Sequence, residues 1–201
     1  MHDKTNKKED RRIIRSRIAL REALLEIMTK KPFRSISITE IVEHANYNRG
    51  TFYSNYESKE ALLDDIVNDL IHDLIKSFRA PYEDVEVFRI NEIPAASVLI
   101  VEHVSRNTAI YSLLMKSDWL PELKTRMYTS LKKIAMEEII YPDDGIDHEL
   151  FTIYNLHAVL GLVFHWIESG YKHSPAYIQD QLIKLVSWRP SDAKISIKTM
   201  K

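Results

Sequence analysis

Residues 48–59 combine side chains that can hydrogen-bond to nucleic acid with aromatic residues at helical spacing. Arg49 can donate two hydrogen bonds to a guanine edge, and Thr51 can contact a base or a phosphate. Phe52 and Tyr56 are four residues apart, so in a helix they share one face and can anchor it to a core. This pattern indicates a helix that turns polar side chains toward DNA while its aromatic face is buried.

Two other residues favour the same function. Gly50 costs a helix about 1 kcal/mol relative to alanine, which suggests that a second molecule approaches the backbone there. Lys59 directly follows Ser58, a good N-cap, so its charge adds to the positive end of the next helix, where phosphate can bind. The residues expected to contact DNA on this reasoning are Arg34, Arg49, Gly50, Thr51, Tyr53, Ser54, Asn55 and Lys59.

Two short helices and a corner must position these side chains. Thr39 is expected to cap the first short helix, and Asn48 the second. Asn46 lies between them and accepts a positive φ more readily than most residues, so it can turn the chain sharply. A long helix is then expected from Ser58 to about Phe78. This order is the plan of the helix-turn-helix, in which the start of the second helix meets base edges in the major groove.

A basic segment precedes this motif. Residues 1–9 are polar and are expected to be disordered; they either follow the DNA or form a solvated tail. A first helix is expected from about Asp10 to Lys30, ended by Pro32. Its buried stripe is expected to contain Ile14, Ile18, Leu24, Leu25 and Met28.

The composition of the 201 residues predicts an all-α fold, because Gly and Pro are few and apolar residues recur every three to four positions. The chain has no cysteine, so thiolate catalysis and cysteine-based zinc sites are excluded, and a cytoplasmic location is expected. Residues 1–60 hold 13 Lys and Arg against 9 Asp and Glu, whereas the remainder holds 15 against 20. A basic front and an acidic back suit a DNA-binding head on a body with another role.

We expect three parts: a DNA-binding domain with its connecting helix at 1–79, a helical effector and dimerisation domain at 80–189, and a polar tail at 190–201. The acidic residues 81–93 are expected to be a loop or a short helix. Helices of the second domain are expected at about 94–105, 107–116, 119–140, 147–169 and 176–187.

The second domain contains aromatic, methionine and histidine side chains that would suit an effector pocket between helices. The same residue types at helical spacing are also typical of an ordinary core, and this alternative stays open. No metal-ligand spacing, catalytic triad or phosphate-binding loop is recognisable, so we expect no metal, no cofactor and no enzyme. The expected pocket residues are His103, Tyr111, Met115, Trp119, Tyr128, Tyr154 and His157.

The expected helix at 147–169 is apolar on several sides, so more than one of its faces must be covered. In a domain of this size, one face would pack on the protein's own core and another on a second copy. Dimers with two-fold symmetry are the commonest oligomers, and Gly161 would permit a close helix crossing. The expected interface residues are Gly161, Phe164, Trp166, Ile178, Leu182 and Leu185.

Residues 10–71 resemble the DNA-binding domain of the TetR family of bacterial transcription regulators. Three motifs carry the resemblance: Thr39-x-x-Ile-Val, Asn48-Arg-Gly-Thr-Phe-Tyr and Tyr56-x-x-Lys-x-x-Leu-Leu. Asn46-Tyr47 departs from the family, which usually has Gly and a small aliphatic residue there. On the family's DNA-contacting positions fall Thr39, Arg49, Gly50, Thr51, Tyr53, Asn55 and Lys59.

The resemblance implies a homodimer that binds a pseudo-palindromic operator in double-stranded DNA and is controlled by an effector in the second domain, without a role at a membrane. Repression is the usual output of the family. Residues 161–170 and 174–185 also resemble the last two helices of one TetR branch, which includes activators that work with a protein partner. The alternative is therefore a helical interaction module or co-activator whose effector is a protein.

Overall fold

The computed structural model describes residues 3–83, 98–141 and 145–187, and these residues contain helices and no strand, which confirms the all-α prediction. Outside the described residues lie most of the acidic segment 81–93, the expected start of the helix at 94–105 and the polar tail at 190–201. The elements are α1 (Asp3–Met28), the 3-10 helix η1 (Phe33–Ser35), α2 (Ile38–His44), α3 (Arg49–Tyr53), α4 (Lys59–Arg79), α5 (Leu99–Arg106), α6 (Thr108–Lys116), α7 (Leu120–Glu138), α8 (His148–Glu168) and α9 (Pro175–Ser187).

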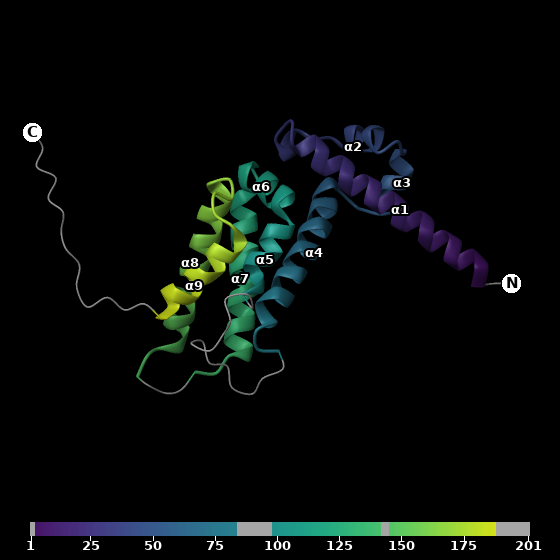
Figure 1. Cartoon of the computed structure of the whole chain (residues 1–201). Coiled ribbons are helices and arrows are strands. Elements are labelled where there is room, and N and C mark those ends of the chain that lie inside the picture. Colours follow the sequence, from purple (N-terminus) through teal and green to yellow (C-terminus); the bar gives the residue numbers. More distant parts are fainter. Residues whose placement is uncertain (1–2, 84–97, 142–144, 188–201) are drawn as a thin grey trace, which may run out of the picture.

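 The head, defined here as α1, η1, α2 and α3, lies at the N-terminal end of α4 (Figure 1). The body, defined as α5–α9, packs alongside α4 through α5 and α7.

The predicted long helix is α4, and it belongs to both parts. Its N-terminal half packs against α1 in the head, and it also packs against α5 and α7 in the body. Ser58 caps it as predicted, because the Ser58 side chain accepts a hydrogen bond from the backbone N–H of Ala61. Its apolar side chains at heptad-like spacing are all buried: Leu62, Leu63, Ile66, Leu70 and Leu74.

The corner between α2 and α3 forms as the sequence predicts. Asn46 has a φ of 55°, the left-handed conformation that asparagine tolerates, and the Tyr47 N–H donates to the Val42 carbonyl at 2.8 Å. Asn48 caps α3, since its side-chain oxygen accepts from the Thr51 N–H at 2.9 Å. These local bonds fix the direction in which α3 leaves α2.

The cap of α2 was predicted wrongly. The capping residue is Ser37 and not Thr39, which lies inside the helix. Ser37 and Glu40 form a capping box, in which the Ser37 side chain accepts from the Glu40 N–H and the Glu40 carboxylate accepts from the Ser37 N–H at 2.9 Å. This reciprocal pair satisfies two backbone donors, whereas a cap at Thr39 would satisfy one.

The capping box makes head stability depend on pH. Hydrogen bonds from Lys31 and then from Ser37 lower the pKa of Glu40 from 4.5 to about 2. Because the folded pKa is the lower one, this contribution is complete above about pH 4.5 and is lost as the pH falls toward 2. We expect Glu40→Gln to flatten the dependence of the thermal midpoint on pH in that window. Glu43→Gln, a change of the same type on an exposed position of α2, should retain the wild-type slope.

Helix α1 differs from its prediction at both its start and its buried face. It begins at Asp3, so residues 3–9 are helical in the structure. Ile14 is exposed, because the N-terminal part of α1 extends past the rest of the head (Figure 1), and Ile18 is exposed as well. Leu24 and Met28 are buried as predicted, and Leu25 is half-buried. The rest of the buried face consists of Ser16, Leu20, Ala23 and Ile27.

The body helices follow their predicted order, with α7 and α8 packed side by side and α6 against both. Asp147 caps α8, and Gly170, with a φ of 71°, follows its end. Asn107 lies at the predicted start of α6 but does not cap it, because its side-chain amide donates back to the His103 carbonyl at 2.9 Å. Among the described residues, α8 alone is long and apolar enough to cross a membrane by length and composition, a test that core helices also pass.

Candidate nucleic-acid interface

Helix α3 turns its polar side outward. Phe52 is fully buried and Tyr56 nearly so, whereas Tyr53 is 51% exposed and Arg49 is exposed. The Phe52 ring packs edge-on against Tyr53, with ring centroids 5.6 Å apart, which holds the Tyr53 ring on the outer side of the helix. The side chain of Ser54 is also exposed, so this face can meet a flat or grooved partner.

The anchor Tyr56 is held by charged groups from two helices. Its hydroxyl donates to Asp65 of α4 at 2.7 Å and accepts from Arg17 of α1 at 3.2 Å. Arg17 also pairs with Asp65 at 2.8 Å, and burial, the largest influence, raises the pKa of Tyr56. Tyr56 therefore stays neutral and ties the end of the α3 segment to both α1 and α4.

Asn55 was expected to contact phosphate, and its donor is already used inside the head. Its amide nitrogen donates to Ser16 of α1 at 3.2 Å and to the Thr51 carbonyl at 2.7 Å. The Asn55 side-chain oxygen is buried and has no hydrogen-bond partner. We therefore reassign Asn55 from a phosphate contact to a residue that holds α3 against α1.

The Lys59 side chain, also expected to contact phosphate, likewise forms its hydrogen bonds inside the head. Its ammonium donates to three carbonyl oxygens, those of Phe33 at 3.0 Å, Arg34 at 3.0 Å and Ile36 at 2.7 Å. These bonds use the three hydrogens of the ammonium, which also lies 4.8 Å from the centroid of the Phe33 ring. Lys59 thus shapes the turn before α2, and a direct phosphate contact would require it to leave that turn.

The structure gives a second reason for glycine at position 50. A Cβ atom added to Gly50 would lie 3.2 Å from the side-chain oxygen of Asn48, the atom that caps α3. This distance is tight, so a larger residue would disturb the cap as well as any close approach to DNA. Thr51 is half-buried, and its hydroxyl lies 3.3 Å from the same Asn48 oxygen.

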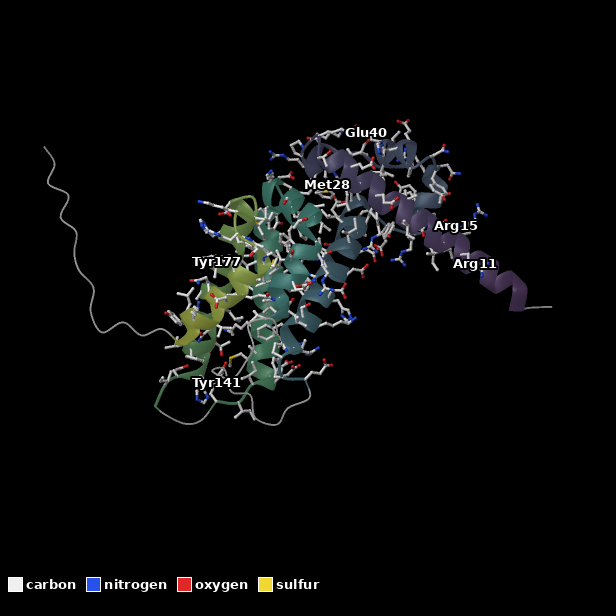
Figure 2. All side chains as sticks on the ribbon, in the orientation of Figure 1. Arg11, Arg15, Met28, Glu40, Tyr141 and Tyr177 are labelled. Carbon is white, nitrogen blue, oxygen red and sulfur yellow. The ribbon has the colours of Figure 1, made fainter. Side chains whose placement is uncertain are left out.

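The two remaining expected contacts come from outside α3. Thr39 is exposed on α2, and the side chain of Arg34 on η1 is 81% exposed. Arg11 and Arg15 project from the exposed part of α1 (Figure 2). Together with Arg49 and Tyr53, these residues give the head exposed cationic and hydrogen-bonding groups suited to a phosphate backbone.

The predicted effector-pocket residues do not surround one space. His103 and Tyr111 are buried together, with the His103 Nε2 atom 3.0 Å from the Tyr111 hydroxyl. Burial lowers the pKa of His103 to about 4, so this imidazole is a neutral, hydrogen-bonded core group. Tyr154 is 73% exposed and His157 is exposed, both on the outside of α8. His103 and Tyr111 are therefore ordinary core residues, which is the alternative that the sequence left open.

The other pocket residues are also dispersed. Met115 is buried in the common core, and the half-buried Tyr128 packs its ring 4.6 Å from that of His157. The Trp119 ring lies 4.9 Å from the Arg126 guanidinium, near the start of α7. Among the described residues, no group of three or more His, Asp or Glu is arranged to hold a metal ion.

A groove of about 310 Å³ lies elsewhere, at the junction of head and body. Ile18 and Leu25 of α1, Ile66 and Leu70 of α4, and Ile110 of α6 form its apolar lining. The sequence analysis did not identify it, because its residues come from three helices that are distant in the chain. The exposed position of Ile18 is explained by this groove.

The predicted interface residues divide into two groups. Trp166, Ile178 and Leu182 are buried within the chain itself, and the Trp166 indole N–H donates to the His173 carbonyl at 2.8 Å, so these side chains expose little surface to a second copy. Gly161 and Leu185 are exposed, and Phe164 is half-buried beneath the Lys124 ammonium.

An exposed row on α8 contains Gly161, a predicted interface residue, together with residues that were not predicted there. It includes Leu150, Tyr154, Ala158, Gly161 and His165, which follow one another at helical spacing on the side away from the core. On α9, Tyr177 and Leu185 are also exposed. The signal was present in the sequence: once Leu156, Leu160 and Val163 are assigned to the core, the opposite side of this apolar helix remains uncovered.

Two family models match the chain. Residues 20–66 match the model described as "Bacterial regulatory proteins, tetR family", and residues 91–187 match a TetR C-terminal model described as "Transcriptional regulator C-terminal region". Among curated proteins, the chain is 24% identical over 181 residues to "Uncharacterized HTH-type transcriptional regulator YxbF" of Bacillus subtilis strain 168. The match covers 90% of this chain and 47% of that protein, so the chain spans about half the length of that relative.

Solved structures show the same fold. A TetR transcriptional regulator from Streptococcus agalactiae 2603V aligns with a TM-score of 0.62 at 24% identity, covering 90% of this chain and 98% of the other. A putative TetR-family regulator from Syntrophomonas wolfei str. Goettingen aligns with a TM-score of 0.61 at 15% identity, covering 85% and 92%. At these identities, the likeness supports the fold.

Proposed function

This chain belongs to the TetR family of bacterial transcription regulators, and from that premise we propose that it is a cytoplasmic homodimer that binds a pseudo-palindromic DNA operator and represses transcription. The observation that carries the proposal is the arrangement of α3. Phe52 of α3 and Tyr56, three residues after its end, are buried, while Arg49 and Tyr53 of α3 and its C-cap residue Ser54 are exposed.

We assign the exposed residues to two kinds of DNA contact. Arg49, at the first position of α3, is the candidate for reading a base in the major groove. Arg34, Thr39, Tyr53 and Ser54 are candidates for phosphate contacts, which position the head without reading sequence. Gly50 and Thr51 complete the surface that approaches the DNA.

The second half of the proposal is a dimer formed through α8 and α9. The exposed row Leu150, Tyr154, Ala158, Gly161 and His165 supports it, since a second copy related by two-fold symmetry could cover this row with its own. A Cβ atom added to Gly161 would meet no atom within 4 Å in the chain, so the space beside it is free for another helix.

The proposed interface predicts the effect of a charge at its centre. Gly161→Arg should convert the dimer to a monomer and weaken operator binding, because a desolvated guanidinium without a partner opposes association. Thr129→Arg adds the same charge at an exposed position of α7 and should leave the dimer intact. Sedimentation velocity of the two variants measures this, and an unchanged dimer in Gly161→Arg would exclude α8 from the interface.

An effector acting on the body is proposed to change DNA affinity through α4, which contacts both parts. Operator half-sites are separated by about 34–36 Å or a multiple, so a small rotation of the heads would break phosphate contacts on each side. Because the predicted pocket residues do not converge, a protein partner is a second candidate for the effector. We propose no catalytic role.

The test is fluorescence anisotropy of the full chain on an operator selected from a random duplex pool, compared with a scrambled duplex at several salt concentrations. We expect a preference for the selected operator and an affinity that falls steeply with salt. If no sequence is enriched and both duplexes bind weakly and equally, the DNA-binding proposal fails and the interaction module is favoured.

A further inference from the structure

A carboxylate of the body binds directly to the head. Asp118 lies between α6 and α7, and its side chain accepts hydrogen bonds from the backbone N–H groups of Phe33 at 3.0 Å and Arg34 at 3.3 Å. These residues are 85 and 84 positions away in the chain and belong to η1, directly before α2. The Arg34 Nε atom lies 3.7 Å from the same carboxylate. The contact therefore joins the corner of the body to the segment that enters the helix-turn-helix.

The opposite side of η1 is held by α4. Lys59 donates to the carbonyl groups of Phe33, Arg34 and Ile36, as described above. The carbonyl oxygens of this turn thus bind a cation from α4, and its N–H groups bind an anion from the body. Because charge-assisted hydrogen bonds are among the stronger ones, the turn has little freedom to move independently of either.

The corner that carries Asp118 is itself fixed to α4. The next residue, Trp119, lies against the Arg126 guanidinium, with 4.9 Å from its carbon to the ring centroid. Arg126 donates to Asp64 of α4 at 2.5 Å and to Glu122 at 2.8 Å. Asp118 therefore contacts η1 from a segment that is itself bound to α4. A displacement of α6 or α7 would move Asp118 and, through it, η1.

We propose that Asp118 is a positioning residue that helps to set the orientation of the DNA-binding head relative to the body, as a further mechanical link beside α4 and the packing of α1 on α6. The inference rests on the proposed function, since orientation matters only if two heads bind one operator. With the link intact, the two recognition helices of a dimer are held at one separation. Without it, each head can rotate about the start of α4, and several separations become accessible.

The experiment measures half-site spacing, a property that ordinary destabilisation would not change. Wild type, Asp118→Asn and Asp118→Ala are compared on the selected operator and on duplexes with one base pair inserted or removed between half-sites, which shifts a half-site by about 3.4 Å. Glu149→Gln is the matched control, because it removes an equal charge from an exposed ion pair with Lys132 inside the body.

We expect the preference of wild type for its best spacing to fall by about fivefold or more in Asp118→Ala, the lower end of the usual coupling between sites, with Asp118→Asn between the two. Hydrogen exchange of the Phe33 and Arg34 amides in the full chain should become faster in the same order. Glu149→Gln should behave as wild type in both measurements. Preserved spacing preference in Asp118→Ala would overturn this inference alone, whereas failure to select any operator would overturn the proposed function as well.

Discussion

Phe52→Ala is expected to destabilise the head by about 3–5 kcal/mol, the usual cost of removing a fully buried phenylalanine. Phe52 is 0% exposed and joins α3 to the core beneath it, so its loss leaves a cavity under the helix that carries the DNA-contacting residues. Since α3 has only five residues, its own hydrogen bonds cannot hold it in place. DNA binding should therefore be lost together with stability.

The adjacent aromatic residue provides the control. Tyr53→Ala removes a ring of similar size from the exposed side of the same helix, and it should change the unfolding free energy by less than about 0.5 kcal/mol. It should still weaken binding to selected and scrambled duplexes alike, because a phosphate contact does not read sequence. Chemical denaturation and anisotropy of both variants measure the two effects. Equal loss of stability in the two variants would contradict the assignment of inner and outer faces.

Arg49→Ala is expected to reduce affinity for the selected operator by about 1–3 kcal/mol, a factor of about 5 to 160, and to relax the preference at one position of each half-site. The reason is its place at the first position of α3, where a side chain enters the major groove. In the free protein its guanidinium has a weak contact, 3.5 Å from the Tyr53 hydroxyl, and so remains available for DNA.

The control for Arg49→Ala must separate the loss of a base contact from the loss of a positive charge. Arg106→Ala removes the same charge from an exposed residue of the body, where Arg106 lies 3.7 Å from Glu102. It should lower affinity slightly and leave sequence preference unchanged. A repeated selection from a random pool with each variant gives the readout. If Arg49→Ala enriches the wild-type motif without alteration, the assignment of base reading to this residue is wrong.

Local features of the head could be predicted from the sequence because neighbouring residues produce them. The left-handed Asn46, the caps at Asn48 and Ser58, and the apolar face of α4 each depend on a few consecutive side chains. The family resemblance followed from the same stretch. The cap of α2 was misplaced because Ser37 and Thr39 are both capable caps, and only the reciprocal bond to Glu40 distinguishes them.

Tertiary packing decided which apolar residues are buried and which remain exposed. Helical periodicity shows which residues of α8 share a face, but not which face the rest of the chain covers. Trp166 therefore belongs to the core and Tyr154 to the surface, against expectation. In α1, likewise, Ile18 borders a groove formed with α4 and α6, whereas Leu20 lies in the core.

The sequence by itself determined the all-α class, the helix-turn-helix and the residues on either side of α3, because these depend on local periodicity and capping. Only the tertiary structure decided the roles of Lys59 and Asp118, which meet at η1 from positions 26 and 85 residues away from Phe33. The sequence does not show which backbone groups a charged side chain will bind. Its partner is set by how distant helices pack, and here that packing joins the body to the head.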